Sequence, residues 1–143
     1  VDFDTMLKES DVLSIHAPLN DETYHIFSTE SFKKMKNDAI IINIARGGLI
    51  DQEALADALE RGEIRFAGLD VFEQEPIEVN SRLLQRDDVT LTCHSAFYGE
   101  ESKARQLQWA YEMTESALNS NTVPGGRVAN RAVMNINKEF KFN

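Results

Sequence analysis

The stretch that decides the fold covers residues 39–48 and reads AIIINIARGG. Its first five residues form a nearly continuous apolar run, which is typical of a strand covered on both faces in a parallel sheet. The stretch then presents Arg46 and two glycines, and glycine tolerates the positive φ that a tight turn from a strand to a helix can need. We therefore predict a buried strand that leaves a parallel sheet through a tight turn and presents a guanidinium there.

Strand and helix patterns alternate along the chain on both sides of this stretch. Short apolar runs predict further strands at residues 12–15, 64–72 and 88–93. Helical patterns predict helices at residues 28–36, 52–61 and 100–119 and a helical turn at residues 80–86. Strands that alternate with helices at this spacing form right-handed βαβ units, so we expect an α/β fold built on a parallel sheet.

Capping residues and one apolar stripe support two of the predicted helices. Asp51 is a suitable N-cap for the helix that follows the double glycine, and Gly62 is a suitable C-terminal stop for it. The last helix has one apolar stripe, made up of Leu107, Tyr111, Thr114 and Leu118. The sequence NTVPGGR at residues 121–127 is expected to end this helix.

Length and composition are those of an ordinary globular protein. The chain has 143 residues, of which 42% are hydrophobic and 27% are charged, so it can bury the core of one domain. The formal net charge is −9, and phosphate backbones repel such a surface, so we expect no nucleic-acid partner. The acidic residues are scattered along the chain, which indicates a solvated surface.

The sequence also limits the compartment and the metal chemistry. Cys93 is the single cysteine, which excludes an internal disulfide framework and a multi-cysteine zinc site, and we expect no metal. A lone cysteine suits a reducing cytosol, so we expect a cytoplasmic protein. No stretch approaches the roughly 20 apolar residues of a membrane span, and no secretory signal opens the chain, so we expect no membrane partner.

Each predicted strand ends in polar or special residues. The four ends carry the loop of residues 16–20, Arg46 with its two glycines, Asp70 followed by Glu73 and Glu75, and His94. Ligands of open α/β sheets bind outside the carboxyl ends of the strands, and a parallel sheet aligns these ends along one edge. We therefore expect an arginine, a carboxylate and an imidazole to share one cleft.

Each of these residues also has a structural interpretation when it is taken alone. Arg46 can be an ordinary surface arginine, and Glu75 can be a solvated loop acid. His94 can be a satisfied histidine at the end of a strand. Of the other histidines, His16 is expected to be structural and His25 exposed. Three candidate residues at the ends of successive strands nevertheless favour a shared functional site.

The residue types suit the reversible reduction of a 2-oxo acid. The planar fork of an arginine holds a carboxylate through two parallel hydrogen bonds and so orients a small acid. A histidine gives or takes a proton near neutral pH, and a neighbouring carboxylate fixes its tautomer and favours its protonated form. A cofactor would deliver hydride to carbon while the histidine protonates oxygen.

Three motifs in order carry a resemblance to a known family. NIARGG at residues 43–48, LDVFEQEP at residues 69–76 and His94 on the next strand resemble the signature of the D-isomer-specific 2-hydroxyacid dehydrogenases. The resemblance covers residues 1–119 and extends weakly into the tail. HSAFYGEES at residues 94–102 is closer to the C-terminal-binding-protein-like branch of this family. The family has a Rossmann-type sheet, and it reduces 2-oxo acids to D-2-hydroxy acids with NAD(P).

The resemblance implies roles for individual residues. Arg46 resembles the arginine that binds the substrate carboxylate, and His94 resembles the catalytic histidine. Glu75 resembles the acid that pairs with this histidine, and Glu73 is the next candidate for that role. The residues that resemble the family's cofactor-binding positions are Ala17, Pro18, Asn20, Thr23, Ile44, Ala45, Arg46, Asp70, His94 and Phe97. Among them, Asp70 resembles the aspartate near the nicotinamide amide.

One family feature has no counterpart in the sequence. The Gly-x-Gly-x-x-Gly loop and the acidic residue about 20 positions beyond it bind pyrophosphate and ribose, and neither occurs in this chain. We therefore interpret residues 1–120 as the second, C-terminal half of a Rossmann domain. Residues 121–143 are interpreted as a tail that returns to a substrate domain outside this sequence. NAD is the expected cofactor and NADP stays open, because the residue that reads the ribose is missing.

This interpretation implies partners and leaves two alternatives. We expect such a fragment to be inactive alone, the protein to be a homodimer, and a small 2-oxo or 2-hydroxy acid to be its substrate. One alternative is a structural α/β domain that only retains these residues. The main alternative is a dinucleotide-sensing protein-interaction module, as in C-terminal-binding-protein-like corepressors. The motifs do not separate this module from a dehydrogenase, because that branch retains the arginine, glutamate and histidine. The identity of the 2-hydroxy acid also stays open.

Overall fold

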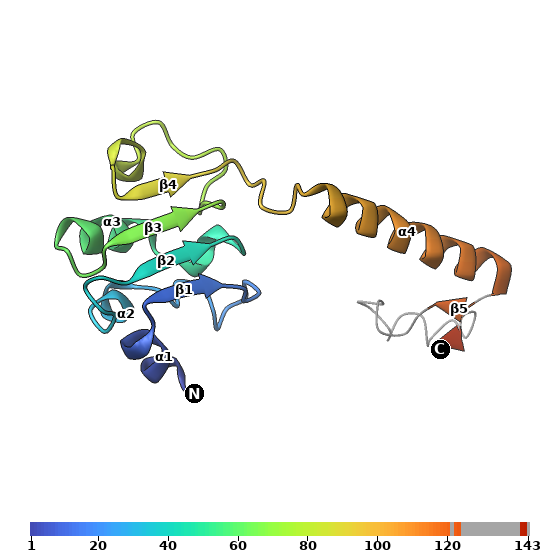
Figure 1. Cartoon of the computed structure of the whole chain (residues 1–143), viewed down its shortest axis with the longest axis horizontal. Coiled ribbons are helices and arrows are strands. Elements are labelled where there is room, and N and C mark those ends of the chain that lie inside the picture. The colour runs from blue at the N-terminus through green and yellow to red at the C-terminus, as the bar shows by residue number, and fades with distance from the viewer. Residues whose placement is uncertain (121, 124–140, 143) are drawn as a thin grey trace. The chain divides into compact units, whose positions relative to one another are not determined.

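The computed structural model describes residues 1–120, 122–123 and 141–142, shown in colour in Figure 1. The chain divides into two compact units, Val1–Ala96 and Phe97–Asn143. The first unit contains the sheet and every predicted site residue except Phe97.

The first unit is built on a four-stranded parallel sheet, as the sequence predicts. The strands are β1 (Val12–Ile15), β2 (Ile40–Asn43), β3 (Phe66–Leu69) and β4 (Val89–Leu91). They lie side by side in chain order, and every neighbouring pair is parallel (Figure 1). Ile41 therefore lies between Leu13 of β1 and Ala67 of β3. The predicted α/β fold with a parallel sheet is confirmed.

Helices and short 3₁₀ turns connect the strands. The helices of this unit are α1 (Phe3–Glu9), α2 (Thr29–Phe32) and α3 (Gln52–Glu60), and the 3₁₀ turns are η1 (Gly47–Leu49) and η2 (Arg82–Gln85). α3 begins as predicted, since the Asp51 carboxylate accepts a hydrogen bond from the Ala54 amide at 3.0 Å. It ends before Gly62, which has a φ of 65°. That value lies in the left-handed region that glycine favours.

Two helices differ from the sequence prediction. α2 is shorter than the predicted range 28–36, because the amides of Lys34 and Met35 bond to carbonyls three residues back, which gives turns instead of an α-helix. α1 was not predicted at all. Asp2 is the N-cap of α1, since its carboxylate accepts from the Thr5 amide at 2.8 Å. This cap was the available sequence signal for the helix.

The core lies on one face of the sheet. Leu13 and Ile15 of β1 and Ile41 of β2 are buried against Phe32 of α2 and Leu55 of α3 in one apolar cluster. Ile40 and Ile42 point to the other face and are only partly buried. The sequence predicts that β2 is covered on both faces. Within the described part of the chain, β2 is fully covered on one face and partly covered on the other.

The second unit begins with a long helix. α4 (Glu100–Ser120) matches the prediction for residues 100–119. All four residues of its predicted stripe, Leu107, Tyr111, Thr114 and Leu118, are exposed. Two short parallel strands follow, β5 (Thr122–Val123) and β6 (Lys141–Phe142). Most of the predicted tail lies outside the described residues, so its expected return to a substrate domain stays a prediction. No described helix is both long and apolar enough to cross a membrane.

Candidate active site

The parallel register aligns the carboxyl ends of the four strands. Asn43, the last residue of β2, is paired with Ile15 of β1 on one side and with Leu69 of β3 on the other. Leu69 is paired in turn with Leu91, the last residue of β4. The loops that carry the candidate residues therefore leave the sheet at one edge, as expected for a ligand site in an open α/β sheet.

His94 and Glu75 form a hydrogen-bonded pair at this edge. His94 Nδ1 lies 2.8 Å from Glu75 Oε2, and their side chains are 44% and 39% exposed. The other oxygen of Glu75 accepts a hydrogen bond from the Phe72 amide at 3.1 Å. The bonds from His94 and from the Phe72 amide hold the pKa of the Glu75 carboxyl below its ordinary value. Glu75 is therefore a carboxylate at neutral pH and can orient the imidazole.

Asp70 fastens the loop that carries His94. Its side chain is buried and accepts hydrogen bonds from the amides of Ser95 and Ala96, each at 2.8 Å, and from the Thr92 hydroxyl. Burial alone would raise the pKa of Asp70, but these hydrogen bonds outweigh it, so the pKa lies below the ordinary value. His94 itself has a φ of 54° and donates its amide to the Asp70 carbonyl at 2.8 Å. These bonds hold the left-handed backbone of His94 in place.

Arg46 follows β2 on a backbone that Asn43 holds. The buried Asn43 amide donates to the Arg46 carbonyl at 2.9 Å, and the Asn43 side-chain oxygen accepts from the Ala45 amide at 3.0 Å. Arg46 is exposed, and its guanidinium donates to the Ala45 carbonyl at 2.7 Å. Sequence reasoning missed the role of Asn43, although a polar residue that ends an apolar run was a usable signal.

The candidate residues line two cavities instead of the single expected cleft. Arg46 lines a cavity of about 720 Å³ together with His16, Ala17, Pro18, Leu19, Ile44 and Ala45. Glu75 and His94 line a second cavity of about 680 Å³, whose other walls include Phe72, Leu91, Thr92 and Cys93. Within the described residues, the structure thus groups four other predicted cofactor residues with the arginine and groups the histidine with its glutamate.

Three predicted cofactor residues, Asn20, Thr23 and Phe97, lie outside the cavity that contains Arg46. Thr23 and Asn20 close the loop after β1, because the Thr23 hydroxyl donates to the Pro18 carbonyl at 2.7 Å and the Thr23 amide donates to the Asn20 side-chain oxygen at 3.0 Å. Phe97 belongs to the second unit and packs edge-on against Tyr98.

Two sequence expectations are corrected by the contacts of Glu73. His25 was expected to be exposed, but it is partly buried and pairs with Glu73 at 2.8 Å between Nε2 and Oε2. Glu73 was the second candidate for the partner of His94, and this contact engages it elsewhere.

No group of three or more acidic, histidine or cysteine side chains among the described residues could hold a metal ion.

Comparison with known proteins defines the class. The family model for the D-isomer specific 2-hydroxyacid dehydrogenase, NAD binding domain, matches residues 1–96. The chain belongs to this family. It is 54% identical over 117 residues to a glyoxylate/hydroxypyruvate reductase B from Shigella dysenteriae, a match that covers 82% of this chain and 36% of that protein.

Solved structures give the same fold. A D-lactate dehydrogenase with NAD⁺ from Lactobacillus jensenii is 36% identical with a TM-score of 0.76, over 83% of this chain and 40% of that one. An acyclic imino acid reductase in complex with NADPH and D-Arg is also 36% identical with a TM-score of 0.76, over 82% and 38% of the two chains. These likenesses confirm the Rossmann-type sheet and the family. The C-terminal-binding-protein-like branch stays a prediction.

Proposed function

We propose that the protein containing this chain reduces small 2-oxo acids to D-2-hydroxy acids with a nicotinamide dinucleotide. The observation that carries this proposal is the pair of His94 and Glu75, which lie 2.8 Å apart at the carboxyl ends of the parallel strands. Strand β2, which pairs with β3, leads to Arg46 at the same edge. The chain spans only about 36% of the length of the curated relative that it matches. We therefore propose that parts of the protein corresponding to the rest of such relatives complete the site.

Each of the three residues has one task in this proposal. The guanidinium of Arg46 holds the carboxylate of the 2-oxo acid through two hydrogen bonds, which orients the adjacent carbonyl. His94 donates a proton to the carbonyl oxygen during reduction and takes it back during oxidation. Glu75 accepts the hydrogen bond from Nδ1, so the second ring proton of His94 is carried at Nε2. The cofactor, when bound, supplies or accepts the hydride.

The cavity around Arg46 suits part of a dinucleotide. Its walls combine apolar side chains and loop backbone from the ends of β1 and β2, chiefly Ala17, Pro18, Ile44 and Ala45. Dinucleotides bind in this position in Rossmann-type sheets. We propose NAD as the cofactor, because the matching family model describes an NAD binding domain. NADPH is the second nucleotide to test, because a relative of the same fold was solved with it.

The arrangement of the whole protein is part of the proposal. We propose that residues 1–120 contribute the second half of the cofactor domain and that residues 121–143 lead back to a substrate domain. Asn20, Thr23, Asp70 and Phe97 are proposed to contact or support the bound nucleotide. We further propose that the protein is a homodimer in the cytoplasm, with no nucleic-acid partner. Glyoxylate and hydroxypyruvate are the first substrates to test, since the relative from Shigella dysenteriae is named for them.

Turnover by the intact protein tests the proposal. Purified protein is mixed with NADH or NADPH and with each of glyoxylate, hydroxypyruvate and pyruvate, and the loss of reduced nucleotide is measured. We expect turnover with at least one acid and formation of the D-enantiomer where the product is chiral. Absence of turnover with every acid and both nucleotides would overturn the proposal. Nucleotide-dependent capture of a protein partner without turnover would support the interaction module instead.

A further inference from the structure

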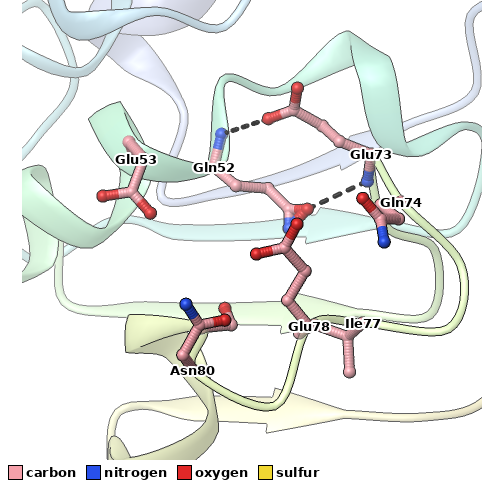
Figure 2. Close-up of a pocket in the computed structure, with 8 residues that line it drawn as sticks. Gln52, Glu53, Glu73, Gln74, Ile77, Glu78 and Asn80 are labelled. Carbon is pink, nitrogen blue, oxygen red and sulfur yellow. Dashed lines mark hydrogen bonds between the residues drawn. The ribbon is translucent and has the colours of Figure 1, made fainter.

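Gln52 and Glu73 are joined by two reciprocal hydrogen bonds, which Figure 2 shows as dashed lines. The Gln52 amide at the start of α3 donates to Glu73 Oε1 at 2.8 Å. The Glu73 amide donates to the Gln52 side-chain oxygen at 2.9 Å. A carboxylate that accepts from the first amide of a helix also interacts favourably with the helix dipole. The loop after β3 is thereby tied to the start of α3.

His25 supplies the third arm of this network. Its Nε2 lies 2.8 Å from Glu73 Oε2, so both oxygens of Glu73 have partners within the chain. The His25 amide donates to the Gly48 carbonyl at 2.8 Å, in the turn that follows Arg46. His25 also stacks on Tyr24, with 3.9 Å between the ring centroids. We call His25, Gln52 and Glu73 the clasp.

The clasp lies where two loops of the candidate site meet. A Cβ added to Gly47 would lie 1.9 Å from the backbone carbonyl atoms of Phe72 and 2.5 Å from the Glu73 nitrogen. Only a glycine allows the turn after Arg46 to approach the loop after β3 this closely. The position of the Arg46 backbone is therefore coupled directly to the position of Phe72 and Glu73.

The same loop leads to His94. The Phe72 amide donates to Glu75 Oε1, and Glu75 Oε2 bonds to His94 Nδ1. A shift of Phe72 therefore moves the carboxylate that orients the imidazole. One short segment, residues 72–75, contacts the arginine turn at one end and carries the partner of the histidine at the other.

We propose that Glu73 is a positioning residue, which through the clasp sets the separation between Arg46 and the pair of His94 and Glu75. Glu73 acts through its neighbours, because both its oxygens are engaged by Gln52 and His25. The inference rests on the proposed reduction of 2-oxo acids, since it assigns a geometric task in that reaction. In this proposal the two glutamates of the loop have different tasks, since Glu75 orients the histidine and Glu73 places the loop.

Kinetics of the intact protein test the positioning role. We expect Glu73→Ala to lower kcat/KM for the 2-oxo acid by about tenfold to a hundredfold, because small displacements of reacting groups are costly. The KM for the nucleotide should stay within about twofold of wild type. Glu73→Gln should recover most of the activity, since its side-chain oxygen can still accept from the Gln52 amide and its NH₂ group can donate to His25 Nε2 when that ring carries its proton on Nδ1. A merely structural role would lower the active fraction and leave the KM of the acid unchanged.

Glu30→Ala is the matched control. Glu30 is a surface glutamate on α2 that pairs with Lys33 at 2.7 Å. Its removal should leave the kinetics unchanged, because exposed ion pairs contribute little. If wild type turns over the acid and Glu73→Ala behaves like Glu30→Ala, the positioning role is overturned while the proposed function stands.

Hydrogen exchange measures the clasp without any activity. In Glu73→Ala, the amides of residues 46–48 and 72–75 should exchange faster than in wild type, and those of residues 28–36 should not change. If wild type turns over no 2-oxo acid, the proposed function fails, and this measurement still decides whether Glu73 positions the two loops. Unchanged exchange at both loops would overturn the inference.

Discussion

The ends of β4 and β2 present their candidate side chains in different ways. At the end of β4, the imidazole of His94 is bonded to Glu75, and the surrounding loop is fastened to the buried Asp70. At the end of β2, the backbone is held by Asn43, but the guanidinium of Arg46 is exposed and donates to the carbonyl of its own neighbour, Ala45. The chain thus orients the imidazole of His94 in advance and fixes only the backbone of Arg46.

This difference fits the tasks proposed for His94 and Arg46. A proton donor must carry its proton on the correct nitrogen before the substrate arrives, so a partner within the chain is useful. A carboxylate-binding arginine must exchange its present partner for the substrate, so a single bond to a nearby carbonyl is easily replaced. Substitutions at the end of β4 should therefore alter protonation and loop stability, whereas substitutions at the end of β2 should alter the binding of the acid.

Removal of the imidazole should have the largest effect. We expect His94→Ala in the intact protein to lower kcat for the 2-oxo acid by about 10² to 10⁴, the usual contribution of a general acid–base group. The dissociation constant of the nucleotide, measured by calorimetry, should change little. A kcat close to that of wild type would remove His94 from proton transfer.

Replacement of the guanidinium tests the other side of the comparison. Arg46→Lys keeps the charge but loses the planar fork, so kcat/KM for the acid should fall by about tenfold to a hundredfold, as expected for one charge-assisted hydrogen bond. Steady-state kinetics with varied acid should show this fall, and nucleotide affinity should stay near the wild-type value. Arg61→Lys, on the surface after α3, is the matched control because Arg61 lies outside both cavities. Equal kinetics for the two variants would exclude Arg46 from the carboxylate site.

The contrast also shows what the sequence can predict. The parallel sheet and the positions of Arg46 and His94 follow from strand patterns, because parallel topology places successive strand ends at one edge. Gly47 was assigned correctly to a turn but for the wrong reason. Gly47 does not have a positive φ. Its lack of a Cβ instead leaves room for the backbone of Phe72. That contact joins residues 25 positions apart, and local patterns do not encode such contacts.

Side-chain partners were harder to predict than positions. The family resemblance gave Glu75 as the partner of His94, with Glu73 as the next candidate, and the structure pairs His94 with Glu75. The pairing of Glu73 with His25 spans 48 positions along the chain and depends on how the loops after β1 and β3 meet. The three hydrogen bonds that Asp70 accepts likewise could not be predicted from the sequence, because two of their donors are backbone amides of the His94 loop. Such contacts appear only once the loops are packed.

Loss of the Asp70 carboxylate should loosen the end of β4. In Asp70→Asn, one side-chain oxygen is replaced by an NH₂ group that faces a backbone donor, so a buried donor loses its partner and stability should fall by about 1–3 kcal/mol. Because the pKa of Asp70 is lowered in the fold, its contribution should be complete above the ordinary pKa of 3.8 and be lost as the pH falls through the lower, folded-state value. Urea unfolding at several pH values measures this, with the exposed Asp38→Asn as control. An equal loss at every pH would contradict the assignment.

The smallest effect, and the most specific, should come from the charge of Glu75. Glu75→Gln keeps the size of the side chain but removes the negative charge that favours protonated His94, so reduction should fall off at lower pH than in wild type. Oxidation, which needs neutral His94, should gain at low pH relative to wild type. The displacement should stay below about one pH unit, because the two side chains are 44% and 39% exposed and water screens their interaction. The measurement is a pair of pH–rate profiles, one in each direction. Glu73→Gln should leave both profiles in place, because Glu73 pairs with His25. If only Glu73→Gln displaces the pH–rate profiles, or if Glu75→Gln shifts the reduction profile to higher pH, the end of β4 is not organised around His94 and Glu75.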